Sequence, residues 1–382
     1  MNRKISITWL FLVLATLSFA QKTKVANALT FQQEGDLKTA YETIQEALNP
    51  ENPKAVKKTL YWAGTWEVKA SILYDIHKAG IRNIVFEPLL ESYKAYNRAI
   101  ELDTKNRMLA GIKEDLHKMQ PDLTDMAVKA FKLGRFDVAL EAYQKYFEIA
   151  DLPLLKDEEP MKIDTAIYYN AGLAAFSSKS WPNAIQFFSK TAHNNKYGED
   201  SYFYLYGVYQ AMSDTLKQYE TLKEAFNKYP ESENINIELV KFCIATERPD
   251  EAIDYIDFAI KRSPDNATFY TLKGRALEDA GNDNDAIEAY LKAIELDANL
   301  FVPTYNLAVI YYNRGVYFIN KAIKLPQDKN DEYDQQVAIG TLELVKGLPL
   351  FEKAKEIQPN DEKVNESLKF IYSHMEKTNN IN

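Results

Sequence analysis

The sequence predicts an all-α fold, a right-handed α-solenoid of about eight helix-turn-helix repeats with a C-terminal capping helix. The main support is a period of 34 residues, since Gly172 and Gly274 stand 102 residues, or three periods, apart. Pro230 and Pro264 stand 34 residues, or one period, apart. Amphipathic helical stretches lie between these markers. A fixed period of this size indicates stacked supersecondary units with a surface suited to binding, and it argues against an enzyme.

Residues 1–20 are predicted to be a cleavable secretory signal. A basic start at Arg3 and Lys4 precedes a short apolar stretch, and small residues stand at Ser18 and Ala20. An uncleaved anchor is the alternative, but the apolar stretch is too short to span a bilayer comfortably. We therefore expect an exported protein, periplasmic or associated with the outer membrane, without stable membrane insertion after cleavage.

The charge balance and the cysteine count limit the possible partners. The chain holds 46 basic and 55 acidic residues, and removal of residues 1–20 leaves 44 against 55. An acidic chain without a basic cluster disfavours nucleic acid and anionic lipid. Cys243 is the only cysteine, so an intramolecular disulfide is impossible. Within its apolar stretch we expect a buried small hydrophobe.

The clearest repeat, residues 267–300, follows the packing logic of a helical hairpin. Small residues at Gly274 and Ala286 allow two antiparallel helices to approach closely. Aromatic residues at Tyr270 and Tyr290 fill the space above and below the crossing. The pattern therefore predicts two packed helices rather than one continuous helix.

The turn inside this repeat has its own signals. Gly281 can take the left-handed conformation that ends the first helix, and Asp285 can cap the second. The run from Asn282 to Asp285 superficially suggests calcium binding. It lacks the central glycine and later glutamate of an EF-hand loop, so we interpret it as a turn with a helix cap.

This arrangement resembles the tetratricopeptide repeat (TPR), whose pattern has aromatic, glycine, tyrosine, alanine and proline residues at these offsets. The resemblance covers nearly all of the chain after residue 20, and the layout is similar to exported TPR proteins of Gram-negative bacteria. The family implies the fold firmly and the function weakly. Other repeats carry the pattern at Tyr168, Gly172, Ala184 and Phe188, at Ala127, Gly134, Ala139 and Tyr143, and at Ala28, Gly35 and Ala40.

The repeats before residue 150 are expected to form an N-terminal lobe. This lobe spans residues 21–150 and contains a repeat at 57–104 whose middle is lengthened. An extra helix is predicted at 106–120, before Pro121. An acidic, proline-bearing linker at 151–162 is the best candidate for a bend between two lobes.

The remaining repeats are expected to form a C-terminal lobe at residues 163–360. Its last repeat contains an insertion at about 316–346, because Pro359 stands 61 residues beyond Ala298 where 34 are expected. We interpret this insertion as a loop or helix extension outside the stack. A capping helix is predicted at 361–377, with Val364, Leu368, Ile371 and Met375 on its apolar face.

The motifs give no indication of catalysis. The sequence lacks a glycine-rich phosphate loop, a nucleophile elbow and a paired-carboxylate signature. We therefore predict no catalytic residues, no metal, no cofactor and no enzyme activity. The four histidines, which lack the spacing of zinc ligands, are His77, His117, His193 and His374.

The resemblance implies a partner-binding groove along the concave face, which the first helix of each repeat lines. Most of the carried-over positions are apolar or aromatic, so the groove suits a helix or hydrophobic peptide better than a C-terminal carboxylate. Packing between repeats is an equally weighted alternative for each residue. The groove residues are Tyr169, Phe176, Tyr204, Val208, Lys241, Arg275, Tyr305, Tyr312 and Asn313.

We expect a non-catalytic protein–protein interaction scaffold or adaptor of the cell envelope, which binds peptides or helices of a protein partner. The alternative is a glycan-binding accessory protein of the outer membrane. Such proteins are normally lipoproteins with a cysteine after the signal, where this chain has Gln21. The sequence leaves the oligomeric state and the partner's identity open.

Overall fold

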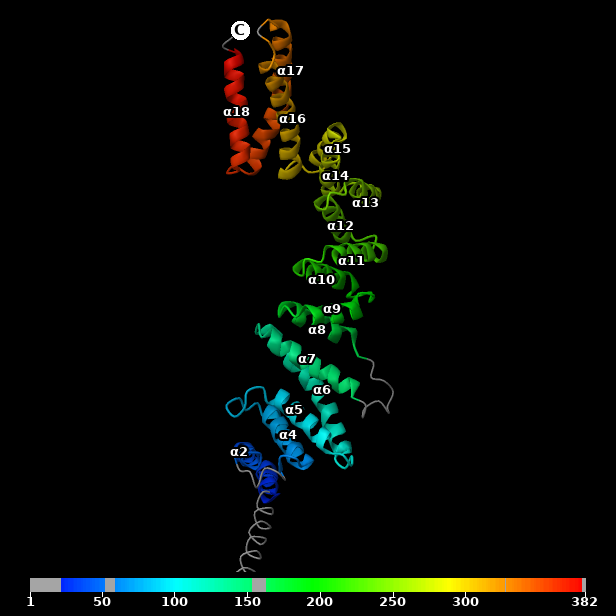
Figure 1. Cartoon of the computed structure of the whole chain (residues 1–382), viewed down its shortest axis with the longest axis vertical. Coiled ribbons are helices and arrows are strands. Elements are labelled where there is room, and N and C mark those ends of the chain that lie inside the picture. Colours follow the sequence, from blue (N-terminus) through cyan, green and yellow to red (C-terminus); the bar gives the residue numbers. More distant parts are fainter. Residues whose placement is uncertain (1–21, 52–58, 153–162, 327, 380–382) are drawn as a thin grey trace, which may run out of the picture. The chain divides into compact units, whose positions relative to one another are not determined.

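The computed structural model describes residues 22–51, 59–152, 163–326 and 328–379, and these ranges form helices joined by turns and loops (Figure 1). No strand occurs among them, which confirms the all-α prediction. The chain divides into two compact units, Met1–Tyr204 and Leu205–Asn382. The predicted signal at 1–20 and most of the predicted linker at 151–162 lie outside the described residues.

The first unit is a series of helical hairpins in which consecutive helices pack against each other. A helix at residues 22–33 begins the described part. The division between the units falls inside the last helix of the series. The helices that follow are α2 (Leu37–Ala47), α4 (Ala63–Lys78), α5 (Pro88–Leu102), α6 (Leu109–Lys132), α7 (Phe136–Asp151), α8 (Thr165–Ser177), α9 (Trp181–Thr191) and α10 (Gly198–Ala211).

Helices α7 and α8, which flank residues 153–162, pack directly on each other. Phe147 of α7 stacks on Tyr168 of α8 with ring centroids 4.7 Å apart, and on Phe187 of α9 at 5.1 Å. Helices α7 and α8 belong to the same unit, which ends at Tyr204.

Helix α6 joins two segments that the sequence suggested were separate. The extra helix predicted at 106–120 continues through Pro121 into the first helix of the next repeat. Proline removes one backbone hydrogen bond inside a helix, but Leu116, Met119 and Leu123 are fully buried on both sides of it. Burial of these side chains outweighs the lost bond, so the helix does not end at Pro121.

The second unit repeats the same hairpin and ends in a longer one. The insertion predicted at about 316–346 lengthens both helices of the last hairpin, and Figure 1 shows them side by side. Two glycines allow the close approach, since a Cβ atom on Gly315 would lie 2.9 Å from the Gly340 carbonyl oxygen. The helices are α11 (Thr215–Lys228), α12 (Glu233–Ala245), α13 (Pro249–Arg262), α14 (Ala267–Asp279), α15 (Asp283–Leu296), α16 (Phe301–Ile323), α17 (Asn330–Ile357) and α18 (Glu362–Asn379).

Helix α18 covers the apolar end of the second unit. The predicted apolar face is confirmed, because Val364, Leu368 and Ile371 are buried in one cluster with Phe351 of α17. This burial gives the terminal hairpin the cap that a stack of repeats requires.

The packing inside the repeat at 267–300 agrees with its sequence pattern. Tyr290 of α15 is fully buried, and its ring lies directly over Gly274 of α14. Gly281 has a φ of +76°, the left-handed conformation expected of it. The helix cap differs from the prediction: Asn282, not Asp285, is the N-cap, and its side chain accepts a hydrogen bond from the Asp285 backbone N–H.

Candidate binding surfaces

In the first unit, three of the predicted groove residues lie together on neighbouring first helices. Tyr169 and Phe176 belong to α8, and Tyr204 belongs to α10. The Tyr204 ring centroid lies 6.3 Å from that of Tyr169 and 5.2 Å from that of Phe176, both edge to face. All three side chains are half-buried. We call these three residues the α8–α10 aromatic surface.

The inner side of this surface rests on Phe188. The rings of Phe188 and Tyr204 stack with centroids 4.8 Å apart and planes 4° from parallel. Phe188 is itself buried against Gly172, where a Cβ atom would lie 2.7 Å from its ring. Close helix packing at Gly172 thus places Phe188 as a platform. The three aromatic side chains of the surface remain partly exposed to solvent.

Tyr169 is also held through its hydroxyl group. The hydroxyl group donates a hydrogen bond to an Asp200 carboxylate oxygen at 3.3 Å, and the ring stacks on Tyr197 with centroids 4.7 Å apart. Burial, followed by the nearby Asp200 charge, raises the pKa of Tyr169. The phenol therefore stays protonated at neutral pH and acts as a hydrogen-bond donor.

Two predicted groove residues of α12 and α14, Lys241 and Arg275, are exposed and paired on their own helices. Lys241 contacts Glu238 at 2.9 Å, and Arg275 contacts Asp279 at 3.1 Å. Exposed pairs of this kind contribute little to stability. Val208 of α10 differs, because it is fully buried. It therefore packs in the core and cannot contact a partner directly.

The remaining predicted groove residues lie on α16. Tyr305 stacks on Phe301 with ring centroids 5.5 Å apart. The rings of Tyr305 and Tyr312 both contact buried Phe351 edge to face, with centroid distances of 6.2 and 6.0 Å. Asn313 is exposed beside them. The structure thus brings Tyr305 and Tyr312 together around Phe351, in an arrangement like that around Phe188.

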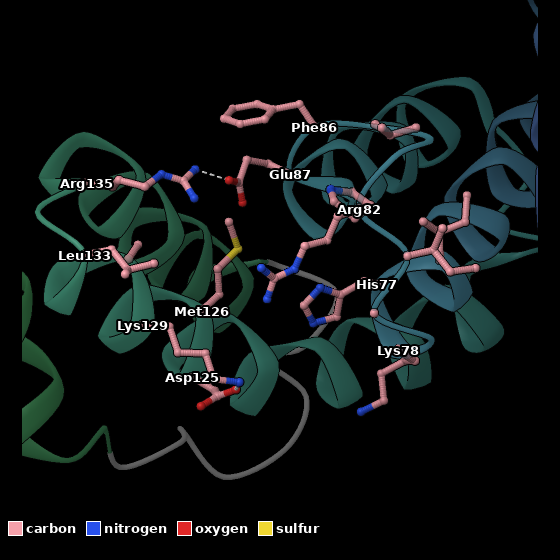
Figure 2. A pocket seen from close by; sticks show the side chains of 16 residues that line it. His77, Lys78, Arg82, Phe86, Glu87, Asp125, Met126, Lys129, Leu133 and Arg135 are labelled. Atoms are coloured by element: carbon pink, nitrogen blue, oxygen red, sulfur yellow. Dashed lines mark hydrogen bonds and ion pairs between the residues drawn. The ribbon is translucent and has the colours of Figure 1, made fainter.

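Sequence reasoning did not identify a cavity of about 550 Å³ in the first unit. It lies between the C-terminal end of α4, the loop at residues 79–87, α6, and the turn that leads into α7 (Figure 2). We call it the α4–α6 pocket. The lengthened middle of the repeat at 57–104 is the sequence signal for this place, because the lengthened stretch includes most of the loop.

Backbone conformations at both ends of the loop position its side chains. Gly80 ends α4 with a φ of +66°, and Glu87 has a φ of +51° directly before Pro88, the first residue of α5. Left-handed conformations are uncommon for residues other than glycine. The bend at Glu87 leaves Phe86 76% exposed at the rim of the pocket.

Several charged residues line the α4–α6 pocket. Arg135 forms an ion pair with Glu87 and lies 5.3 Å from the centroid of the Phe86 ring. Lys129 pairs with Asp125 at 2.5 Å. Arg82 makes no ion pair or hydrogen bond with any residue that the structure describes. Figure 2 shows its guanidinium extending into the pocket between His77 and Met126.

His77 contributes a neutral ring to the same pocket. Burial is the main cause that lowers the pKa of His77. The charges of Lys78 and Lys129 lower this pKa further, whereas those of Asp122 and Asp125 raise it. At neutral pH the imidazole is therefore uncharged and can both donate and accept hydrogen bonds.

The described residues contain neither a metal-binding cluster nor a membrane-spanning helix. No group of three or more histidine, cysteine, aspartate or glutamate side chains is arranged to hold a metal ion. Within the same residues, no helix has the length and apolar character needed to cross a membrane.

Comparisons with known proteins point to one repeat family. A tetratricopeptide-repeat family model matches residues 124–199 and 244–300. A TPR repeat-containing protein of Methanocaldococcus jannaschii is 25% identical over 146 residues, which are 38% of this chain and 20% of that protein. The chain thus spans about a fifth of the length of the curated relative it matches.

Two solved structures align with about half of this chain at low sequence identity. A crystal structure of the MamA protein aligns at a TM-score of 0.37 and 18% identity, covering 47% of this chain and 92% of MamA. A crystal structure of YrrB, described as a TPR protein with an unusual peptide-binding site, aligns at a TM-score of 0.37 and 17% identity. The alignment covers 48% of this chain and 89% of YrrB.

Proposed function

Because this chain is a tetratricopeptide-repeat protein, we propose that it is a non-catalytic scaffold or adaptor that binds a protein partner through the α8–α10 aromatic surface. The observation that carries the proposal is the arrangement of Tyr169, Phe176 and Tyr204. They lie on two first helices, with Tyr204 in ring contact with both of the others, and all three are only partly buried. Aromatic residues of this kind are enriched at protein interfaces, because an apolar ring and a polar tip suit a half-buried contact.

The expected occupant is a helix or hydrophobic peptide of the partner. The rings are already held by Phe188 and Tyr197, so binding costs little side-chain entropy. Apolar anchors of an amphipathic helix, spaced three or four residues apart, would lie on the three rings. The cell envelope is the proposed location, and this part of the proposal rests on the signal-like sequence of residues 1–20.

Photo-crosslinking tests the proposal directly. Benzoylphenylalanine placed at Phe176 should form an adduct with a partner protein in cells that make the chain, because this position is half-exposed on the proposed surface. The same residue placed at exposed Lys190 of α9 is the control and should not form that adduct. Mass spectrometry identifies the partner. Equal adducts from both positions, or no protein adduct from Phe176, would contradict the proposal.

A substitution pair separates binding from folding. Tyr169→Ala combined with Tyr204→Ala should reduce partner binding, whereas Tyr61→Ala, at an exposed tyrosine elsewhere in the unit, should not. Circular dichroism verifies that helix content is retained in both. Retention of carbohydrate from envelope extracts in place of protein would favour the glycan-binding alternative.

A further inference from the structure

The α4–α6 pocket presents an apolar surface that is open to solvent. Met126, only 9% exposed, forms its floor together with buried Ile76. At the rim, Phe86 and Leu133 are 76% and 72% exposed. Large apolar side chains this exposed around a concave site are typical of a surface that a ligand covers.

The uncompensated charge in this pocket is positive. Its two carboxylates, Glu87 and Asp125, are already paired with Arg135 and Lys129. Lys78 is paired as well, with Asp122 outside the pocket lining, at 3.1 Å. Arg82 alone among the lining cations has no carboxylate partner within the described part of the chain. The site is therefore locally cationic in a chain whose net charge is −9.

These two features together restrict the chemistry of the ligand. A purely apolar ligand would cover the Arg82 guanidinium without supplying an anion, which is unfavourable for a charge removed from water. A small inorganic anion would leave Phe86 and Leu133 exposed. Nucleic acid carries a charge on every phosphate, so it would bring several negative charges, where Arg82 can pair with one, toward Glu87 and Asp125 in an acidic chain.

We propose that the α4–α6 pocket binds an acidic segment of a partner protein, in which a carboxylate side chain lies next to an apolar side chain. The carboxylate pairs with the Arg82 guanidinium, whose planar fork matches two carboxylate oxygens. The apolar side chain lies on Met126 between Phe86 and Leu133. A polypeptide rather than a small acid is favoured because the two rim residues extend the apolar contact beyond the cavity.

This site shares no residue with the α8–α10 aromatic surface, so the proposal does not depend on the one above. Peptide arrays test it. Short peptides, acetylated and amidated at their ends, carry a central aspartate or glutamate flanked by leucine, isoleucine, valine or phenylalanine. A matched array replaces the acid with asparagine or glutamine. Both are probed with the chain lacking residues 1–20, and the best binders are measured by fluorescence anisotropy.

The expected result is selective binding of acidic peptides. Arg82→Gln should weaken the best binders by about tenfold or more, the loss of one charge-assisted pair. The substitution should not impair folding, because Arg82 is exposed and forms no ion pair or hydrogen bond with the described residues. Arg107→Gln, at an exposed arginine outside the pocket lining, should leave binding unchanged, as should Tyr169→Ala with Tyr204→Ala.

A double-mutant cycle makes the assignment specific. In the Arg82→Gln background, exchange of the peptide acid for its amide should cause little further loss of affinity. The reason is that the Arg82 guanidinium and the peptide carboxylate act on each other. Failure of every peptide to bind, equal binding of acid and amide peptides, or binding that is independent of Arg82 would overturn the proposal. Equally effective competition by free hexanoate would overturn the assignment to a polypeptide.

Discussion

Gly274 and Tyr290 are complementary across the crossing of α14 and α15. A Cβ atom built on Gly274 would lie 2.5 Å from two carbons of the Tyr290 ring, closer than real Cβ atoms approach their neighbours. The ring is fully buried, so it has little space to move away. The glycine therefore determines how closely the two helices pack.

Substitution of this glycine tests the relationship. Gly274→Ala should lower the free energy of unfolding by ~1–3 kcal/mol, the usual effect of overpacking a buried site. The control is Gly111→Ala in α6, where the nearest atom to the added Cβ is 4.0 Å away; that change should be neutral or stabilising by up to ~1 kcal/mol. Urea unfolding measures both. Equal effects at the two positions would mean that the Tyr290 contact does not set the requirement for glycine at residue 274.

The N-cap of α15 provides a second test. Asn282→Ala removes the side-chain acceptor for the Asp285 backbone N–H and should destabilise the protein by ~1 kcal/mol. Asn282→Ser keeps a side-chain acceptor at the N-cap, so most of the stability should be retained. Thermal melts compare the three proteins. Equal melting temperatures for the alanine variant and the wild type would refute this cap assignment.

Cys243 is expected to be unreactive while the protein is folded. Its side chain is fully buried between α12 and its neighbours, and burial raises the pKa of the thiol from 9.0 to about 11. This difference leaves about a hundredfold less thiolate at neutral pH, and alkylation requires thiolate. Iodoacetamide labelling followed by mass spectrometry should be slow in buffer and rapid in denaturant. Rapid labelling of the folded chain would contradict the observed burial.

Glu278 should make stability depend on pH. Its carboxylate accepts the Tyr290 hydroxyl hydrogen bond at 3.0 Å, but burial, the largest influence, raises its pKa above the ordinary 4.5. The folded state therefore prefers the protonated acid. The stabilising contribution is complete below pH 4.5 and is lost as the pH rises through the folded-state pKa.

Glu278→Gln isolates this contribution. Glutamine keeps an acceptor for Tyr290 and carries no charge, so the variant should melt at a higher temperature than the wild type at neutral pH. The difference should shrink as the pH falls toward 4.5, where the wild-type side chain becomes protonated. Glu288→Gln, at an exposed position of α15, is the control. A difference in melting temperature that is the same at every pH would exclude Glu278 as the source of the pH dependence.

Local contacts are the features that sequence reasoning located well. Gly281 takes the left-handed turn expected of it, and Val364, Leu368 and Ile371 form the buried face of the capping helix. These predictions succeed because each depends on residues within one hairpin or one helix face. The Asn282 cap shows the limit of such reasoning, because Asn282 and Asp285, three positions apart, both have side chains that can cap a helix.

Other features depend on contacts that the sequence does not encode locally. Burial on both sides of Pro121 keeps α6 continuous, although proline usually indicates a helix boundary. Val208 and Tyr204 belong to the same helix, yet one is fully buried and the other half-exposed. Repeat position alone could not distinguish these outcomes, because neighbouring helices decide how much of each side chain is covered.

The sequence by itself determined the helical repeat, the all-α fold and the aromatic character of the first helices, because a 34-residue period and small–aromatic pairs recur along the chain. Only the tertiary structure revealed the α4–α6 pocket. Arg82 and Phe86 come from the loop after α4, whereas Met126 and Leu133 come from α6 and the turn that follows it. Their combination of charge and apolar surface exists only after the helices pack, because a site formed between hairpins has no contiguous motif.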